Sequence, residues 1–101
     1  MQARYRIEPP IPATVESFDV EHFGQYQPRG FNPAAFAGAI RDVPIQHLDS
    51  PTSRWLDYPG QREGHSVVRL RGRDGVEIGS FVLPSAGCAR FTGDVLRWAA
   101  P

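Results

Sequence analysis

The chain has 101 residues, of which 11 are acidic and 11 are basic, and every basic residue is Arg. With 41% hydrophobic and 22% charged residues, this composition excludes a disordered chain and fits a single domain spanning residues 1–101. The zero net charge provides no global field that would attract nucleic acid or an anionic membrane. A GC-rich genome explains the absence of Lys more simply than selection for bidentate Arg pairing.

The number of cysteines and the length of apolar runs indicate the cellular compartment in which the protein is expected. Cys88 is the only cysteine, so no intramolecular disulfide can form. The first residues lack the apolar run of a signal peptide, and no stretch approaches the roughly 20 apolar residues of a membrane span. We therefore expect a cytoplasmic protein that does not enter a membrane. No sequence feature indicates an oligomeric state.

The N-terminal quarter predicts a strand, a connector and an ambiguous segment. Residues 3–7 alternate polar and apolar side chains, which is typical of a short strand. The proline-rich stretch 9–12 ends it and predicts an extended connector. Residues 14–23 also alternate, which favours a strand, although Val15 and Phe18 would suit a helical turn as well.

The segment from about 33 to 42 predicts the main helix. Asn32 can act as its N-cap, and Pro33 occupies the first helical position, where a missing N–H is not needed. Phe36 and Ile40 then share one face, and several alanines favour helix. Pro44 sets the end near Asp42, because proline disfavours helix in the residue before it.

A β-hairpin from about residue 65 to 83 is the central predicted element. Its turn lies at residues 73–75, and a three-residue loop places Gly75 in the left-handed position of a bulge. In that register Arg71 pairs with Glu77, a favourable cross-strand charge pair. A two-residue turn would instead mix arginines and aliphatic residues on one face, so we predict the three-residue loop.

This register assigns the side chains of the hairpin to two faces. The inner face is apolar and consists of Val68, Leu70, Val76, Ile78 and Val82. The outer face carries Arg69, Arg71, Glu77 and Gly79 near the turn, and Val67, Phe81 and Leu83 farther from it. A one-residue slip would exchange the two faces.

The C-terminal segment 92–100 admits two readings. A short amphipathic helix would use Val95, Leu96 and Trp98, and it is slightly favoured. Alternatively, residues 92–94 turn a second hairpin between residues 89–91 and 95–98. With the other elements this predicts an α+β fold: a small antiparallel sheet of three to five strands, with the helix at about 33–42 packed on it. The expected core consists of Phe36, Ile40, Leu56, Val68, Leu70, Ile78, Val82 and Trp98.

No motif identifies a reaction or a cofactor. His22, His47 and His65 are scattered and lack metal-ligand spacing, so no metal or cofactor is predicted. Cys88 is more simply a small buried hydrophobe than a nucleophile. His65 and Ser66 are adjacent in a predicted strand and therefore point to opposite faces.

The absence of a catalytic constellation favours a binding protein over an enzyme. We expect a protein-binding module of the inhibitor, immunity or accessory-subunit type, with a mobile element of a GC-rich bacterium as a suggested source. A patch of apolar and Arg side chains on the outer face of the hairpin is the predicted contact surface: Val67, Arg69, Arg71, Phe81 and Leu83.

Two alternatives stand beside this prediction. Arg69, Arg71 and Arg73 could bind nucleic acid or an anionic ligand, and such binding would weaken steeply with salt. A small enzyme with dispersed carboxylates is the second alternative, although capping is the simpler role for the aspartates near predicted element ends. These aspartates are Asp42, Asp49, Asp57 and Asp94.

Overall fold

The fold is built almost entirely from β-strands. A computed structural model describes residues 5–48, 64–83 and 94–101, and these residues contain no α-helix. The predicted α+β fold with one main helix is therefore wrong. The described helical structure is a single 3-10 turn, η1 (Ile45–His47).

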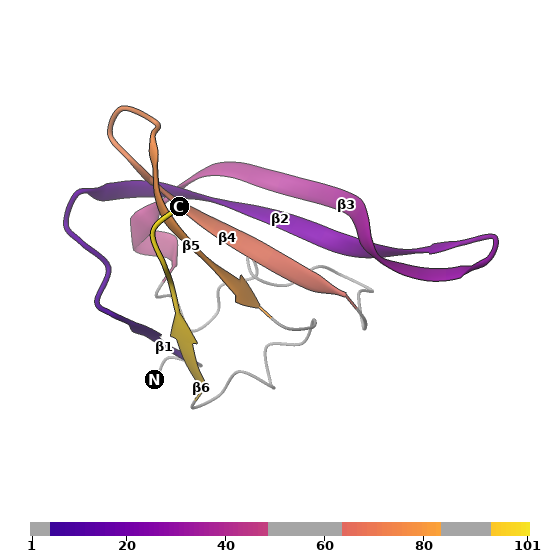
Figure 1. Ribbon diagram of the computed structural model, residues 1–101. Helices are drawn as coiled ribbons and strands as arrows, with labels where there is room; N and C mark the ends of the chain where they lie inside the picture. The colour runs from indigo at the N-terminus through magenta and orange to yellow at the C-terminus, as the bar shows by residue number, and fades with distance from the viewer. Residues whose placement is uncertain (1–4, 49–63, 84–93) are drawn as a thin grey trace.

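Four strands form the main sheet, which is antiparallel throughout (Figure 1). Its order is β3 (Gly30–Pro44), β2 (Val15–Gln27), β4 (His65–Gly72) and β5 (Glu77–Leu83). The long strand β2 is central, since it pairs with β3 from Ser17 to Gln27 and with β4 from Val15 to Phe23. The strand expected in residues 14–23 is thus confirmed, and it extends further than predicted.

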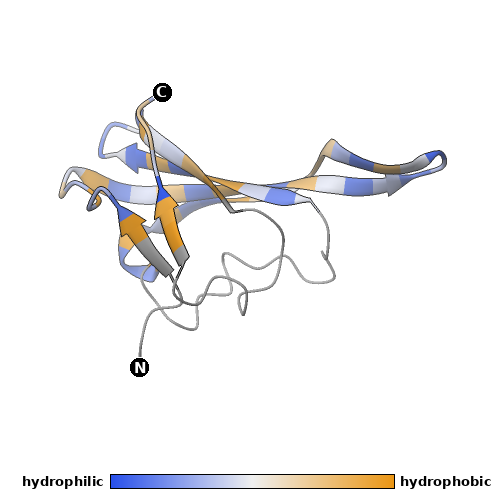
Figure 2. Ribbon diagram, turned by 60° about the horizontal axis from the view of Figure 1, so that its bottom comes forward, coloured by the Kyte–Doolittle hydropathy of each residue, from blue (hydrophilic) through white to orange (hydrophobic). Residues whose placement is uncertain are grey.

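A second, two-stranded sheet joins segments from the two ends of the described chain. β1 (Tyr5–Glu8) runs parallel to β6 (Asp94–Arg97), and the two lie side by side (Figures 1 and 2). The strand expected near residues 3–7 is confirmed. The helix favoured for residues 92–100 is wrong, because this segment contains strand β6, which pairs with β1. The alternative hairpin would join it to residues 89–91, which lie outside the described residues.

The core lies on one face of the main sheet. Cross-strand neighbours share a face, and Phe18 faces Leu70 while Val20 faces Val68. All four side chains are fully buried. The other buried hydrophobic residues are Val15, Val43, Leu48, Phe81 and Leu96.

The predicted core overlaps only partly with this one. Val68 and Leu70 are buried, and Ile40, Ile78 and Trp98 pack against the core as partly buried residues. Phe36 and Val82 were placed wrongly, because their side chains are 53% and 54% exposed. Leu56 and Cys88 lie outside the described residues.

The segment predicted as a helix is strand β3, because β2 offers it a continuous partner. Asn32 does accept a hydrogen bond from the backbone N–H of Ala34 at 3.0 Å, as an N-cap would. The chain then continues extended, with Phe36 opposite Phe23 and Ile40 opposite Val20. Pairing along β2 outweighs the local helical preference.

The C-terminal segment closes over strand β5. Ser80 and Ala99 exchange two backbone hydrogen bonds of 3.0 Å, and the Trp98 indole N–H donates to the Pro9 carbonyl at 2.7 Å. The Trp98 ring lies against Gly79, where a Cβ would stand 2.8 Å from the Ala99 oxygen and closer still to the ring. Gly79 is therefore required for this contact.

In the described part of the chain, no helix has the length and apolar character needed to cross a bilayer.

The contact with Trp98 predicts that Gly79→Ala destabilises the fold. The added methyl group must displace the Trp98 ring or the Ala99 backbone, and overpacking of this kind costs about 1–3 kcal/mol. Urea unfolding would measure the loss. Gly72→Ala is the matched control, because its nearest neighbour is the flexible end of Ile78 at 3.2 Å. Equal stability of the two variants would contradict this account.

Candidate functional site

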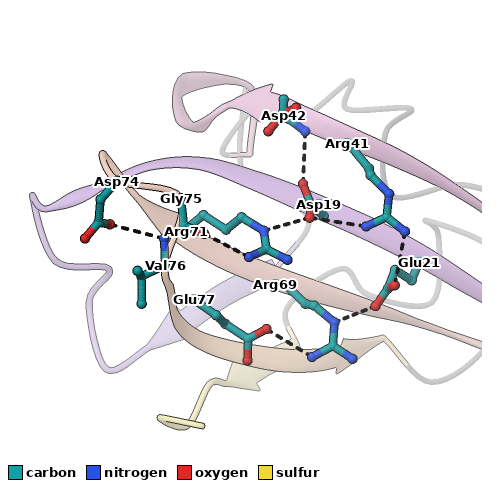
Figure 3. Close-up of polar contacts among 10 residues, drawn as sticks. All are labelled: Asp19, Glu21, Arg41, Asp42, Arg69, Arg71, Asp74, Gly75, Val76 and Glu77. Atoms are coloured by element: carbon teal, nitrogen blue, oxygen red, sulfur yellow. Dashed lines mark hydrogen bonds and ion pairs between the residues drawn. The ribbon is translucent and has the colours of Figure 1, made fainter.

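The outer face of the main sheet carries a network of ion pairs built around Asp19. Arg71 Nε donates to Asp19 Oδ2 at 2.8 Å, and Arg41 Nη1 approaches the same oxygen at 3.5 Å (Figure 3). The backbone N–H of Asp42 donates to Asp19 Oδ1 at 3.0 Å. The Asp19 side chain is only 3% exposed, so a buried carboxylate is held by donors from β3 and β4.

A bulge in β3 makes this arrangement possible. Phe18 pairs with Val43 and Val20 with Ile40, so two residues of β3 stand opposite Asp19. One of them, Asp42, has a φ of 57° in the left-handed region, which aspartate tolerates better than most residues. The bulge thereby directs the Asp42 N–H toward the carboxylate.

The network continues along the face through Glu21. Arg69 Nε donates to Glu21, Arg69 Nη1 lies 3.1 Å from Glu77 Oε1, and Arg41 Nη2 lies 3.5 Å from Glu21 Oε2 (Figure 3). Three arginines therefore face three carboxylates, and their charges cancel. The hydrogen bond to Glu21 raises the pKa of Arg69, against the effect of burial.

The electrostatic state of Asp19 follows from its donors. Burial by itself would raise the pKa of this carboxyl, but the hydrogen bonds from Asp42 and Arg71 and the charges of Arg71 and Arg41 outweigh it. The pKa of Asp19 therefore lies below its ordinary value of 3.8. At neutral pH the carboxylate is ionised and serves as a structural anchor.

The five residues of the predicted contact surface do not share one face. Arg69 and Arg71 lie on the outer face, within the ion-pair network, and Val67 lies beside them, half-buried. Phe81 pairs with Val68 on the inner face and is only 3% exposed, so its placement beside Arg69 was wrong. Leu83 pairs with Ser66, and its side chain lies outside the description.

A bulge explains this difference. The pairing of Arg71 with Glu77 is as predicted, but the register then shifts by one residue, so that Leu70 pairs with Gly79 and Arg69 with Ser80. The slip exchanges the faces of β5 beyond the turn. It places Val82, instead of Phe81, on the outer face, and it places Gly79 beneath Trp98.

A projecting arm, residues 25–36, is the feature that sequence reasoning missed. Pairing with β4 ends at Phe23, and among the described strands only β2 and β3 continue beyond it (Figure 1). Tyr26 is 75% exposed and Phe36 53% exposed. The rings of Tyr26 and Phe31 lie 5.1 Å apart, centroid to centroid.

Aromatic contacts also secure the base of the arm. The Phe23 ring stacks on His65 at a centroid distance of 5.2 Å and meets Phe36 edge-on at 5.8 Å. Such pairs contribute about 0.5–1.5 kcal/mol beyond the burial of their area. They fix the direction in which the arm leaves the sheet.

The composition of the arm differs from that of the rest of the chain. Residues 25–36 contain one charged residue, Arg29, whereas 22% of the whole chain is charged. Hydrophobic and hydrophilic stretches both occur along the arm, and its tip is hydrophilic (Figure 2). This low charge was visible in the sequence and could have indicated a contact surface. The predicted helix instead explained the alanines and phenylalanines of this segment as buried residues.

His22 and Ser66 form a buried polar pair between β2 and β4. His22 Nδ1 lies 2.7 Å from Ser66 Oγ, and the two residues are 2% and 9% exposed. Burial lowers the pKa of His22 below its ordinary value of 6.5. Because both side chains are buried within the sheet, a substrate cannot reach them. Within the described ranges, no three acidic, His or Cys side chains cluster as metal ligands.

Comparisons with protein-family models, with curated proteins and with solved structures found no match to this chain.

Asp19→Asn should weaken the fold by roughly 2–3 kcal/mol at pH 7, because charge-assisted hydrogen bonds are lost at a buried position. The lowered pKa means that Asp19 stabilises the folded state fully above pH 3.8 and loses this effect as the pH falls through the folded-state pKa. The free energy of unfolding, measured with urea across this pH range, should fall less steeply toward low pH for the variant than for the wild type. Glu16→Gln, at an exposed position, is the control, and an equally small effect of both substitutions would contradict the anchoring role.

His22→Gln should reduce the dependence of stability on pH in a separate, higher range. The buried neutral imidazole of the wild type contributes fully above pH 6.5, and its contribution is lost as the pH falls below that value. Glutamine retains a hydrogen-bonding group toward Ser66 and does not titrate. Thermal unfolding at a series of pH values would detect the change, with His65→Gln as control. Parallel profiles for wild type and His22→Gln would refute the prediction.

Proposed function

We propose that this chain is a protein-binding module and that the arm, residues 25–36, is its main contact element. The observation that carries this proposal is an exposed, projecting ribbon with aromatic side chains and a single charge. Exposed aromatic side chains are costly to leave in water, and grouped together they mark an interaction surface more often than a solvated one.

The residue types of the arm fit a protein partner. Protein interfaces are enriched in Tyr, Phe and Arg, and their centres are depleted of Lys, Glu and Asp. The arm has Tyr26, Phe36 and Arg29 at exposed positions and no acidic residue. Exposed amide side chains, such as Gln27 and Asn32, can donate and accept hydrogen bonds with a partner backbone.

The way in which the arm is held also favours binding. Its strands are continuous with the central strand of the sheet and its neighbour, and the ring contacts of Phe23 fix its base. A preorganised element loses less conformational entropy when it binds. An inhibitor, immunity protein or accessory subunit would use such a projection to reach a cleft in its partner.

The alternative of nucleic-acid binding has less support. Arg69 and Arg71 already contact Glu21, Glu77 and Asp19, so their binding to phosphates would require these ion pairs to break. Arg73 is exposed but lies next to Asp74 in the turn. The outer face therefore offers little net positive charge to a phosphate backbone.

The proposal is tested by affinity capture with the wild-type chain and with the double variant Tyr26→Ser and Phe36→Ser. Truncating aromatic anchors at an interface costs about 2 kcal/mol or more, so the variant should bind roughly 30-fold more weakly. Proteins that the wild type retains and the variant loses would be purified and their affinities measured by calorimetry.

The matched control is Val82→Ser, which removes an apolar side chain that is 54% exposed on the sheet, away from the arm. It should retain the same proteins as the wild type. If the arm variant retains the full set while Val82→Ser loses it, the contact lies on the sheet face and the role of the arm is overturned.

A further inference from the structure

An open groove lies at the end of the main sheet opposite to the arm. It has a volume of about 570 Å³ beside the β4–β5 turn and the start of β2. Val76 and Ile78 give it an apolar lining, and Glu16, Arg73 and Asp74 contribute charged groups. Val76 is 60% exposed, so an apolar side chain seated here would find a matching surface.

The charges at the two ends of the sheet are complementary. Among the charged side chains in the described ranges, Arg29 at the arm tip and Glu16, Arg73 and Asp74 at the groove form no ion pair. All four are exposed. The groove therefore carries a net charge of −1, from two acids and one arginine, and the arm carries +1.

The arm cannot reach the groove of its own chain. Glu16 is the second residue of β2, and the arm tip follows the far end of this continuous 13-residue strand (Figure 1). At about 3.3 Å per residue, this strand is roughly 40 Å long. The only copy of the arm that can meet this groove belongs to another molecule.

We infer that the arm of one copy docks in the groove of a second copy, so that chains join end to end. This inference deepens the proposed function, because it names the partner of the arm as a second copy of this chain. The aromatic pair of Tyr26 and Phe31 contacts Val76 and Ile78, while Arg29 faces Glu16. Aromatic side chains bury roughly 150–250 Å² each, which suits a groove of this size.

Such contacts join two different surfaces, so a copy that is joined through one contact still has a free arm or a free groove unless the assembly closes on itself. An interface of this heterologous kind produces rings or open filaments. The average mass should therefore rise with concentration above that of the monomer.

The experiment is sedimentation velocity of the purified full chain over a range reaching about 1 mM, the range of weak association. The wild type should assemble as its concentration rises. Arg29→Glu or Glu16→Arg alone places like charges together and should raise the half-assembly concentration about tenfold or more. An equimolar mixture of these two variants should assemble as the wild type does, because each arm then meets a groove of opposite charge.

Val82→Ser is the control and should assemble normally, and circular dichroism would verify that every variant is folded. The inference would be overturned if the wild type stayed monomeric at all concentrations. It would also be overturned if neither charge reversal changed the half-assembly concentration. If the monomeric chain still retains another protein through its arm, the proposed function stands and only the self-docking falls. If the chain neither assembles nor retains another protein through its arm, both the self-docking and the proposed function are overturned.

Discussion

The buried carboxylate of Asp19 is the constraint on which the main sheet depends. It lies on the central strand and accepts a backbone N–H from one neighbouring strand and a guanidinium from the other. A charge at this depth is tolerable only when its lone pairs are satisfied. The bulge at Asp42, the position of Arg71 and the register of three strands are thus linked to one side chain, and a slip of either neighbour would leave a buried anion without donors.

Local patterns predicted some of this fold but not the contacts that join distant segments. Alternation correctly indicated the strands at residues 14–23 and 65–83, and charge pairing correctly placed Arg71 opposite Glu77. The helix at about 33–42 was wrong because capping at Asn32 is a local interaction, whereas its competitor is pairing with a long strand. The register shift beyond the turn places Gly79 beneath Trp98, a residue distant in sequence, and the local pattern of the hairpin gave no sign of this contact.

The candidate site was harder to predict than the sheet. Arg69 and Arg71 were recognised as outer-face residues, but their acidic partners on β2 could not be identified without the strand order. The arm was overlooked because its aromatic residues suit a buried helix face as well as an exposed ribbon. Only the tertiary arrangement distinguishes these cases, since β4 pairs with β2 no further than Phe23, and the rest of the hairpin projects beyond the sheet.

The parallel pair of β1 and β6 has a consequence for the order of folding. The Trp98 indole reaches the Pro9 carbonyl across 89 positions of the sequence, and closing so long a loop is entropically costly. The hairpins of the main sheet close far shorter loops and can form first. We therefore expect the C-terminal segment to close over β5 after the main sheet has formed, so that the edge of β5 at Ser80 stays unpaired with Ala99 until then.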